Sequence, residues 1–493
     1  MKKYMLGIDQ STQGTKGIVF DEDGKIVART DLAHDQIVNE KGWVEHDPAQ
    51  IMANVIQVVK NAVEKAGIDK KDVIGLGISN QRETAICWSR RTGEPVYNAI
   101  VWQCARGDAI CRQIVADGHS AMIQEHTGIP LSPYYSAAKI AWVLQNVEEA
   151  KQAAAQGELA VGTMDSYLVY RLTPEHFFKT DYSNASRTQM FNINTLDWDD
   201  EVIGLFGIKR EMLAEICDSD ALYGYTDFDG WLDTPIPIHG VMGDSHGALY
   251  GQGCVKPGMI KATYGTGSSI MMNVGERPIY SKKGVVSSLA WSLGGKVSYV
   301  LEGNINYTGA VITWLQKDLG LIASAKETQE LAESANPGDT TYLVPAFTGL
   351  GAPYWDSEAR AVICGITRTT RKAELARAAL DCIVYQISDV VNAMSEDSGI
   401  RVEELRVDGG PTRNGYLMQF QSDILDIPVQ VPDAEELSAM GPTYAAGIAL
   451  GFYEEEKLFA GLSRTKFTPK MDEETRREKY DGWKESVRMV LTK

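Results

Sequence analysis

The chain has 493 residues, too many for one ordinary hydrophobic core, which predicts two large domains with a ligand cleft between them. With 48 Lys and Arg against 66 Asp and Glu, its net charge of -18 argues against nucleic acid or an anionic membrane surface as a partner. The seven cysteines show no CxxC spacing, and no stretch has the character of a signal peptide or a membrane span, so we expect free thiols, no zinc site and a cytoplasmic location.

Strands and helices alternate along the chain, which favours an α/β fold. The first half is expected to open with a three-stranded meander, because a turn sequence (DEDG) separates two apolar runs. A Pro-Gly pair precedes the strands of the second half, so we place the domain boundary near residue 253, giving domains 1–252 and 253–493. The expected strands are 4–9, 15–21, 25–30, 73–79, 259–264, 268–274 and 298–302, and the expected long helices are 48–66, 372–398 and 438–451.

Two short stretches, one in each half, share a pattern of strand, tight Gly/Ser/Thr turn and second strand. They are residues 6–16 (LGIDQSTQGTK) and 262–269 (ATYGTGSS). Backbone N–H groups and hydroxyls converge in such turns, so the pair predicts two jaws around one polyphosphate. Asp9 lies where a carboxylate would hold Mg²⁺ through water, and Lys16 where an ammonium would meet a phosphate. Each turn alone is also compatible with a plain connection, and Asp9 with a turn former.

An acid and an imidazole follow a strand at residues 243–248 (GDSHGA). Asp244 is the candidate general base, taking the proton of an acceptor hydroxyl as that hydroxyl attacks a γ-phosphate. A structural turn closed by the Asp244 side chain is the competing interpretation. His246 competes as the base, although a carboxylate is the usual partner of an alcohol nucleophile in phosphoryl transfer.

Polar and aromatic residues suited to a polyol follow another strand. Arg82 and Glu83 offer a donor fork and an acceptor pair for vicinal hydroxyls, with a surface ion pair or a helix cap as the alternative. Trp102 and Tyr134 would wall the C–H faces of the polyol, unless they belong to the core. Residues 405–414 (LRVDGGPTRN) predict a strand, a Gly-Gly turn and a helix, where a flat base could lie against the backbone.

Taken together and in this order, these motifs resemble the FGGY carbohydrate kinases, and most closely the glycerol kinase branch. The resemblance extends over nearly the whole chain. Further segments that resemble that branch are residues 42–48 (GWVEHDP), 80–84 (NQRET), 184–188 (NASRT), 345–355 (PAFTGLGAPYW) and 418–423 (MQFQSD).

The resemblance implies a pair of ribonuclease-H-like (actin-like ATPase) domains around a central cleft, closing over ATP and the acceptor. It implies in-line transfer of the γ-phosphoryl group to a primary hydroxyl, with Asp244 as the base. By the same resemblance Asp9 would organise Mg²⁺. The residues it assigns to ATP are Thr12, Gln13 and Lys16 at the phosphates, Gly265 and Thr266 in the second phosphate loop, Gly309 and Thr313 along the nucleotide, and Gly410 and Asn414 at the adenosine; those it assigns to the acceptor are Arg82, Glu83, Trp102, Tyr134 and Asp244.

The acceptor pocket departs from that branch. Ser245 stands where glycerol kinases usually carry Gln, Ser269 replaces the Phe that walls the glycerol pocket, and Cys104-Ala105 replaces an Asp-Arg pair. Smaller side chains leave room for roughly one or two more CHOH units. We therefore expect a four- or five-carbon polyol or ketose (erythritol, xylulose, ribulose or a pentitol), as in a xylulose kinase, with glycerol kinase activity as the alternative.

Regulation and assembly are also expected from the resemblance. The loop that binds fructose bisphosphate in some relatives corresponds to residues 230–233, where Asp233 replaces the cation, and the loop at residues 221–225 lacks the His that a phosphocarrier modifies in others. We expect neither control, and a homodimer or homotetramer as the assembly. An actin-like protein switched by ATP, without a small acceptor, remains the remote alternative.

Overall fold

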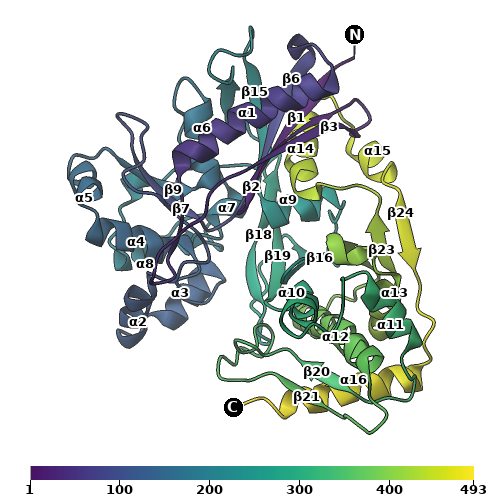
Figure 1. The fold of residues 1–493 in the computed structure, drawn as a ribbon. Helices are drawn as coiled ribbons and strands as arrows, with labels where there is room; N and C mark the ends of the chain where they lie inside the picture. Colours follow the sequence, from purple (N-terminus) through teal and green to yellow (C-terminus); the bar gives the residue numbers. More distant parts are fainter. Residues whose placement is uncertain (1, 493) are drawn as a thin grey trace.

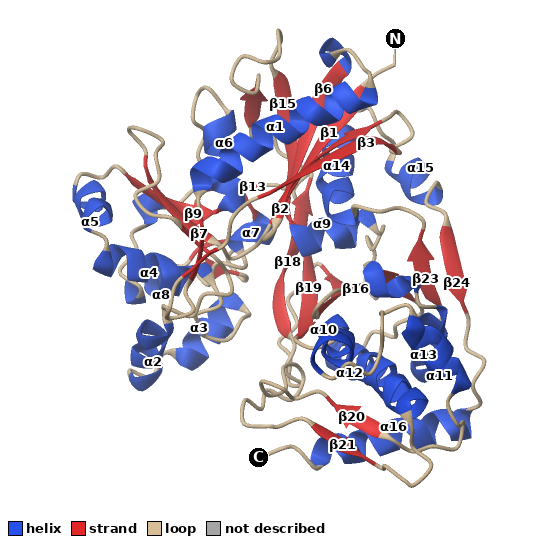
Figure 2. Ribbon diagram, in the orientation of Figure 1, coloured by secondary structure: helices blue, strands red, loops and turns tan. Residues whose placement is uncertain are grey.

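The computed structural model describes residues 2–492 and is built around two large sheets, one from each half of the chain (Figure 1). Helices pack on the sheets, as the colouring by secondary structure shows (Figure 2). Within the described residues, no helix combines the length and the apolar character needed to cross a membrane. All seven cysteines are free thiols in the structure.

The first sheet has six strands in the order β14-β15-β6-β1-β2-β3. β1, β2 and β3 form an antiparallel meander, whereas β6 and β15 run parallel to β1. Helix α1 packs on one face of this sheet and α14 on the other. The bounds are β1 Tyr4–Gln10, β2 Gly14–Phe20, β3 Ile26–Ala33, β6 Val73–Asn80, β14 Gly224–Thr226, β15 Ile236–Gly243, α1 Pro48–Ala66 and α14 Leu437–Ala449.

The second sheet repeats this arrangement. Its order is β18-β19-β17-β16-β22-β23-β24, in which β16, β17 and β19 form the antiparallel meander and β22 and β23 run parallel to β16. The long helix α12 packs against β17 and β19. The bounds are β16 Ile260–Tyr264, β17 Ser268–Gly275, β18 Val286–Leu293, β19 Lys296–Ile305, β22 Leu405–Asp408, β23 Val429–Pro432, β24 Arg464–Phe467, α10 Gly309–Thr313, α11 Glu327–Ser334, α12 Lys372–Ser398, α13 Gly415–Leu425, α15 Glu455–Ala460 and α16 Glu473–Arg488.

The first half carries an additional lobe, seen at the left of Figure 1. Its sheet has the order β4-β5-β8-β7-β9. The remaining bounds are β4 Ile37–Val38, β5 Val44–His46, β7 Ala85–Ser89, β8 Ala99–Ile100, β9 Leu159–Thr163, β10 Lys179–Asp181, β11 Phe191–Asn192, β12 Asp197–Trp198, β13 Glu215–Cys217, α2 Asp108–Ala116, α3 Ser120–Thr127, α4 Ser136–Asn146, α5 Glu148–Ala155, α6 Met164–Leu172, α7 Tyr182–Ala185, α8 Asp200–Leu205 and α9 Asp244–Gly251, with the pair β20 Tyr342–Val344 and β21 Val362–Cys364 in the second half.

Two helices cross where the halves meet. α9 follows the last parallel strand of the first sheet, and α14, from the second half of the chain, packs against α9 and against β1, β6 and β15. The crossing is close, since a Cβ on Gly441 would lie 2.0 Å from the Gly247 carbonyl oxygen. Only glycine fits such an approach of two backbones. The domain division at residue 253 therefore stays a prediction, because a helix beyond it completes the first sheet.

The expected fold is confirmed, with strands and helices close to the expected positions. Helices 48–66 and 372–398 have the expected bounds. The first begins at the Asp47 cap, whose carboxylate accepts from Ala49 N, and ends at Gly67 in a left-handed conformation. β18 was not among the expected strands, and it places β19 in the interior of the second sheet.

Candidate active site

The first hairpin brings Asp9 and Lys16 face to face, because they are paired residues of β1 and β2. Lys16 Nζ lies 3.3 Å from Asp9 Oδ2, and Ser79 Oγ donates to Asp9 Oδ1 at 3.0 Å. Burial raises the pKa of Asp9, while the Lys16 ammonium opposes that rise. Asp9, the residue expected to hold Mg²⁺, is therefore fixed at the end of a buried strand by its contacts with Lys16 and Ser79.

Lys16 has a second partner that the sequence did not suggest. Its Nζ lies 2.6 Å from Glu436 Oε2, and Glu436 also pairs with Arg29 at 2.6 Å. Glu436 directly precedes α14 and has a left-handed backbone (φ 64°). Lys16, which was expected to face phosphates, is therefore shared between two carboxylates at the edge of a cavity.

That cavity, of about 680 Å³, lies between the two halves. Asp9 and Lys16 of the first half line it together with Asp408, Gly410 and Glu436 of the second. A polyphosphate bound there would meet polar groups from both halves of the chain.

Thr12 and Gln13 form the tip of the first hairpin. Thr12 Oγ1 accepts a hydrogen bond from Trp102 Nε1 at 2.9 Å, and the Thr12 carbonyl contacts His34 Nε2 at 2.9 Å. The Gln13 side chain is exposed. The hairpin that was expected at the phosphates is thereby joined to Trp102, one of the expected acceptor residues.

The second hairpin is fixed by the start of α10. Gly309 N donates to the Gly265 carbonyl at 2.9 Å, and Ala310 N donates to the Thr266 carbonyl at 3.0 Å. A Cβ on Gly309 would lie 2.5 Å from that same Gly265 oxygen. The close approach of hairpin and helix therefore requires glycine, and it brings three of the expected nucleotide residues together.

A second cavity, of about 500 Å³, lies beside this contact. The four residues expected along the nucleotide and adenosine, Gly309, Thr313, Gly410 and Asn414, all line it. Apolar side chains such as Leu380 contribute to its walls. A mainly apolar slot with a few polar groups is typical of a site for a flat base. Asn414 differs from expectation in one respect, because its Oδ1 caps α13 by accepting from Leu417 N at 3.0 Å.

Arg82 is buried, which excludes the surface ion pair that was the alternative for it. Its Nη1 and Nη2 each donate to Glu302 at 2.9 Å, and its Nε lies 3.2 Å from Asp244 Oδ1. The guanidinium therefore joins the candidate base to a carboxylate of the second half.

Glu83 is buried too, with an unusual backbone. Its φ of 59° lies in the left-handed region, which is uncommon outside glycine. Ser136 Oγ donates to the Glu83 carbonyl at 3.0 Å, and Arg187 Nε donates to Glu83 Oε1 at 2.7 Å. Backbone strain of this kind concentrates at functional sites.

Asp244 begins α9, directly after β15. Its side chain is 35% exposed, whereas that of Arg82 is 6% exposed, so Asp244 is the open member of the pair. Exclusion of water by the surrounding protein raises the pKa of Asp244, and Arg82 limits that rise. Ser245 N donates to Asp244 Oδ1 at 2.6 Å, so the turn contact of the alternative interpretation is also present.

His246 does not compete well as the base. Its ring is fully buried, and neither ring nitrogen has a hydrogen-bond partner within the described residues. Burial lowers its pKa well below the ordinary value of 6.5. The ring is therefore neutral and enclosed.

Trp102 and Tyr134 pack edge to face with ring centroids 5.5 Å apart. Burial raises the pKa of Tyr134 well above 10.0, so its hydroxyl keeps its proton at neutral pH. The pair forms an aromatic corner, as expected for the C–H faces of a polyol.

Sequence reasoning missed two residues of this cluster, Glu302 and Arg187. Both side chains are essentially buried, and Arg187 Nη1 lies 3.0 Å from Glu302 Oε2. A signal existed for Glu302, the one charged residue in the stretch VSYVLEGNI, because a lone charge in an apolar strand requires a buried partner.

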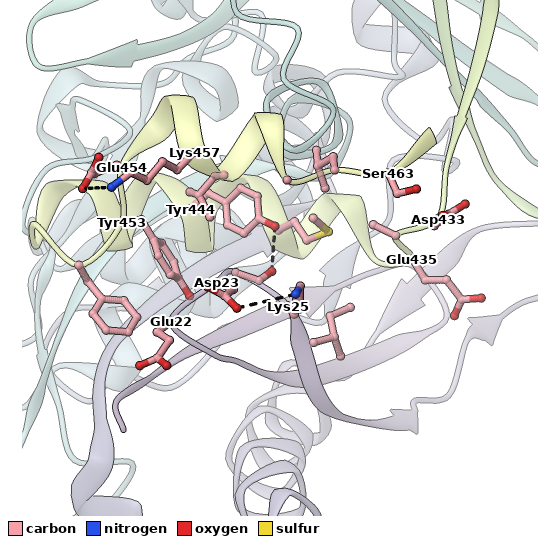
Figure 3. Close-up of a pocket in the computed structure, with 18 residues that line it drawn as sticks. Glu22, Asp23, Lys25, Asp433, Glu435, Tyr444, Tyr453, Glu454, Lys457 and Ser463 are labelled. Carbon is pink, nitrogen blue, oxygen red and sulfur yellow. Dashed lines mark hydrogen bonds and ion pairs between the residues drawn. The ribbon is translucent and has the colours of Figure 1, made fainter. Parts of the chain in front are cut away.

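The largest of these cavities, about 860 Å³, lies elsewhere (Figure 3). It is lined by the turn between β2 and β3 and by Tyr444 and Tyr453, whose hydroxyls donate to the carbonyls of Gly24 and Asp21. None of the expected site residues lines it, so its size carries no argument for catalysis.

Comparison with known families agrees with these observations. The model of the N-terminal domain of the FGGY family of carbohydrate kinases matches residues 4–251, and that of the C-terminal domain matches residues 260–450.

Individual relatives are similar over their full length. Glycerol kinase 2 of Thermotoga maritima is 48% identical over 491 residues, which cover 99% of both chains. The glycerol kinase of Alkaliphilus oremlandii is 46% identical over 493 residues, which cover 100% of this chain and 98% of the relative. The crystal structure of Plasmodium falciparum glycerol kinase with ADP has a TM-score of 0.94 at 35% identity, and the match covers 100% of this chain and 99% of the other.

These relatives correct one expectation. The prediction of a four- or five-carbon acceptor, and with it the assignment as a xylulose kinase, is wrong, because the full-length relatives at 43–48% identity are glycerol kinases. The ligand-bound xylulose kinase of Lactobacillus acidophilus, with a TM-score of 0.88, is only 22% identical and shows a shared fold alone; the match covers 99% of this chain and 97% of that one. A physical reason is that Ser269 Oγ is itself buried, so a small side chain at this position does not by itself provide space for a longer acceptor.

The ATP-switched protein without a small acceptor is likewise set aside, since both halves match kinase domains. The protein is a phosphotransferase that uses ATP and an alcohol acceptor. Its two sheets, its paired hairpins and its full-length relatives show that the chain belongs to the FGGY family of carbohydrate kinases.

Proposed function

We propose that the protein is a glycerol kinase, which transfers the γ-phosphoryl group of ATP to a primary hydroxyl of glycerol. The observation that carries the chemistry is the position of Asp244, which is 35% exposed and lies 3.2 Å from Arg82 Nε. The choice of glycerol is supported by full-length relatives at up to 48% identity.

Arg82 and Glu83 bind the acceptor hydroxyls, and Trp102 and Tyr134 enclose its carbon chain. Asp244 accepts the proton of the attacking hydroxyl, so the nucleophile reaches phosphorus as an oxyanion-like group without releasing a free proton into the cleft. The raised pKa of Asp244 supports this role, because a stronger base accepts that proton more readily.

Ser245 and Ser269 flank the acceptor without enlarging its site. Ser269 Oγ is buried and has no hydrogen-bond partner among the described residues. Ser245 follows the base and orients it through its backbone N–H.

The nucleotide lies across both halves. Thr12, Gln13 and Lys16 contact the phosphates from the first hairpin, and Gly265 and Thr266 contact them from the second. The adenosine occupies the cavity of about 500 Å³ between Gly309, Thr313, Gly410 and Asn414. Binding of ATP requires Lys16 to exchange Glu436 for a phosphate, a change that the flexible lysine stem allows.

Asp9 is the proposed Mg²⁺ residue, and its surroundings fit that ion. Within the described residues no group of three or more His, Cys, Asp or Glu could hold a metal, so the chain offers one carboxylate instead of a complete set. Mg²⁺ in phosphoryl transfer is bound in this way, mostly by water and substrate phosphates. When bound, the ion neutralises charge that develops on the phosphates. Asp9, held by Ser79, orients that site.

We expect a homodimer or homotetramer, with no nucleic acid or membrane as a partner, since the net charge of -18 repels both. The seven free thiols favour a reducing compartment such as the cytoplasm.

The test is identification of the product. Purified protein with Mg-ATP and glycerol should form a phosphomonoester visible by phosphorus NMR, in equal amount to ADP. Without an acceptor, ADP release should be slow, because closure of the halves excludes water. Equal ADP release with and without glycerol, and no phosphomonoester, would contradict the proposal.

A further inference from the structure

Glu302 is a carboxylate of the second half that reaches the proposed acceptor site in the first. It lies on β19, and its side chain is fully buried. We propose that Glu302 is a positioning residue for the acceptor, fixing Arg82 directly and Glu83 through Arg187. This inference rests on the proposed function and adds residues to the same site.

Glu302 forms a bidentate ion pair with Arg82. Two guanidinium nitrogens donate to the two Glu302 oxygens, each at 2.9 Å, which fixes the plane of the group. That plane directs the third nitrogen, Nε, to Asp244 at 3.2 Å. The orientation of Arg82 relative to the base is thus determined by a residue that touches neither the acceptor nor the base.

Glu302 is connected to Glu83 through Arg187, which contacts both carboxylates. Arg187 Nη1 lies 3.0 Å from Glu302 Oε2, and Arg187 Nε donates to Glu83 Oε1 at 2.7 Å. Arg187 also lies over the Tyr135 ring, 5.2 Å from its centroid, which limits its movement. Arg187 thereby links the Glu302 carboxylate to the Glu83 carboxylate.

The charges of this cluster explain why a carboxylate is required. Glu302 stands between two buried guanidinium groups, and they hold its pKa well below 4.5, so it stays ionised. Without that charge, Arg82 would turn fully to Asp244, and Arg187 fully to Glu83. Both carboxylates would then be engaged with arginine and less available to glycerol.

An interdomain tether is the competing role, since Glu302 and Arg82 come from different halves. A tether that only keeps the cleft closed would affect ATP and glycerol alike. A positioning residue affects glycerol alone, although Glu302 belongs to the half that carries the adenosine cavity. The two roles therefore predict different kinetic constants.

The experiment compares wild-type protein with Glu302→Gln, an isosteric change that removes the charge. We expect the KM for glycerol to rise on the order of tenfold to a hundredfold, because misplaced contacts are costly at a reacting site. The KM for ATP should stay within about twofold of wild type, since binding of ATP uses other residues.

Two further variants complete the test. Glu45→Gln is the matched control, because it breaks another buried pair, Glu45 with Arg106 at 2.6 Å, and should leave both KM values unchanged. Arg187→Lys keeps the charge but loses the fork, and should give a smaller rise in the glycerol KM. If Glu302→Gln does not fold, Arg187→Lys decides the matter.

An unchanged glycerol KM in the folded variants, or an equal rise in both KM values, would overturn the inference. Failure of the proposed function is distinguishable, because wild-type protein would then not phosphorylate glycerol at all.

Discussion

The two hairpins at the centre of the molecule have the same strand arrangement and different polar chemistry. At the end of β1 and β2, Asp9 and Lys16 face each other as charged partners. At the end of β16 and β17, the turn offers Gly265 and Thr266, which carry no charge and are held by backbone hydrogen bonds. The first hairpin therefore supplies charged side chains and the second an uncharged turn, so a repeated scaffold does not imply repeated chemistry.

The third strands of the two sheets differ in a similar way. β3 is an edge strand with several exposed residues, whereas β19 is covered by β18 and becomes interior. Only the interior strand can hold a fully buried, ionised carboxylate, Glu302, surrounded by arginines. The extra strand thus makes possible the contact between the halves at the acceptor site.

If the first half supplies the charged groups of the site, neutralising one of its carboxylates should lower the rate of phosphoryl transfer. The largest effect is expected at Asp244. Asp244→Asn should lower kcat by about 10²- to 10⁴-fold, since an amide cannot accept the hydroxyl proton. ATP affinity, measured by calorimetry, should change little. Retention of more than about a tenth of the wild-type kcat would show that Asp244 is not the base.

The same carboxylate predicts a pH limit. The pKa of Asp244 is raised above 3.8, so kcat/KM should fall as the pH decreases through that raised value, where the base becomes protonated. The residual kcat/KM of Asp244→Asn should show no such decrease at low pH.

Substitution of Asp9 should have the next largest effect, and that effect should be specific to the first hairpin, which carries the charged residues. Asp9→Asn should raise the Mg²⁺ concentration needed for half-maximal rate by roughly tenfold to a hundredfold, because the neutral amide orients the ion poorly. Titration of Mg²⁺ at fixed ATP measures this. A lower rate with an unchanged Mg²⁺ requirement would assign Asp9 to folding alone.

A smaller effect is expected from a substitution that displaces the second, uncharged hairpin. In Gly309→Ala, the new Cβ would meet the Gly265 carbonyl at 2.5 Å and displace the second hairpin, raising the KM for ATP by about tenfold. Gly204→Ala is the control, since its Cβ would meet nothing within 4 Å. Equal ATP KM values in both variants would show that the hairpin position is unimportant.

No effect is expected from fructose bisphosphate. By the family resemblance, Asp233 would stand where some relatives carry a cation, and its carboxylate lies 2.9 Å from Lys70 Nζ. An acid repels a bisphosphate, so the rate with saturating glycerol should be unchanged when the compound is added. Inhibition would reopen the question of regulation.

Much of the fold followed from local sequence signals. Helix 372–398 has the expected bounds because its apolar residues extend to Met394 and Gly399 then closes it in a left-handed conformation. Four of the residues expected at the nucleotide, Gly309, Thr313, Gly410 and Asn414, line one cavity, although their roles remain predictions.

What the sequence did not reveal depends on contacts between distant segments. Glu302 and Arg187 meet only after the halves pack together, and α14 packs on the first sheet although it belongs to the second half. The acceptor size was misjudged because Ser269 suggested free space, whereas the packed structure encloses its hydroxyl. Side-chain volume in a sequence does not determine the volume of a site.

The most direct measurement is a comparison of kcat/KM for glycerol with those for erythritol, xylulose, ribulose and the pentitols, under one Mg-ATP condition. A glycerol kinase should prefer glycerol by at least about tenfold, because larger polyols do not fit a site closed around three carbons. A larger acceptor with the highest kcat/KM would contradict the proposed function.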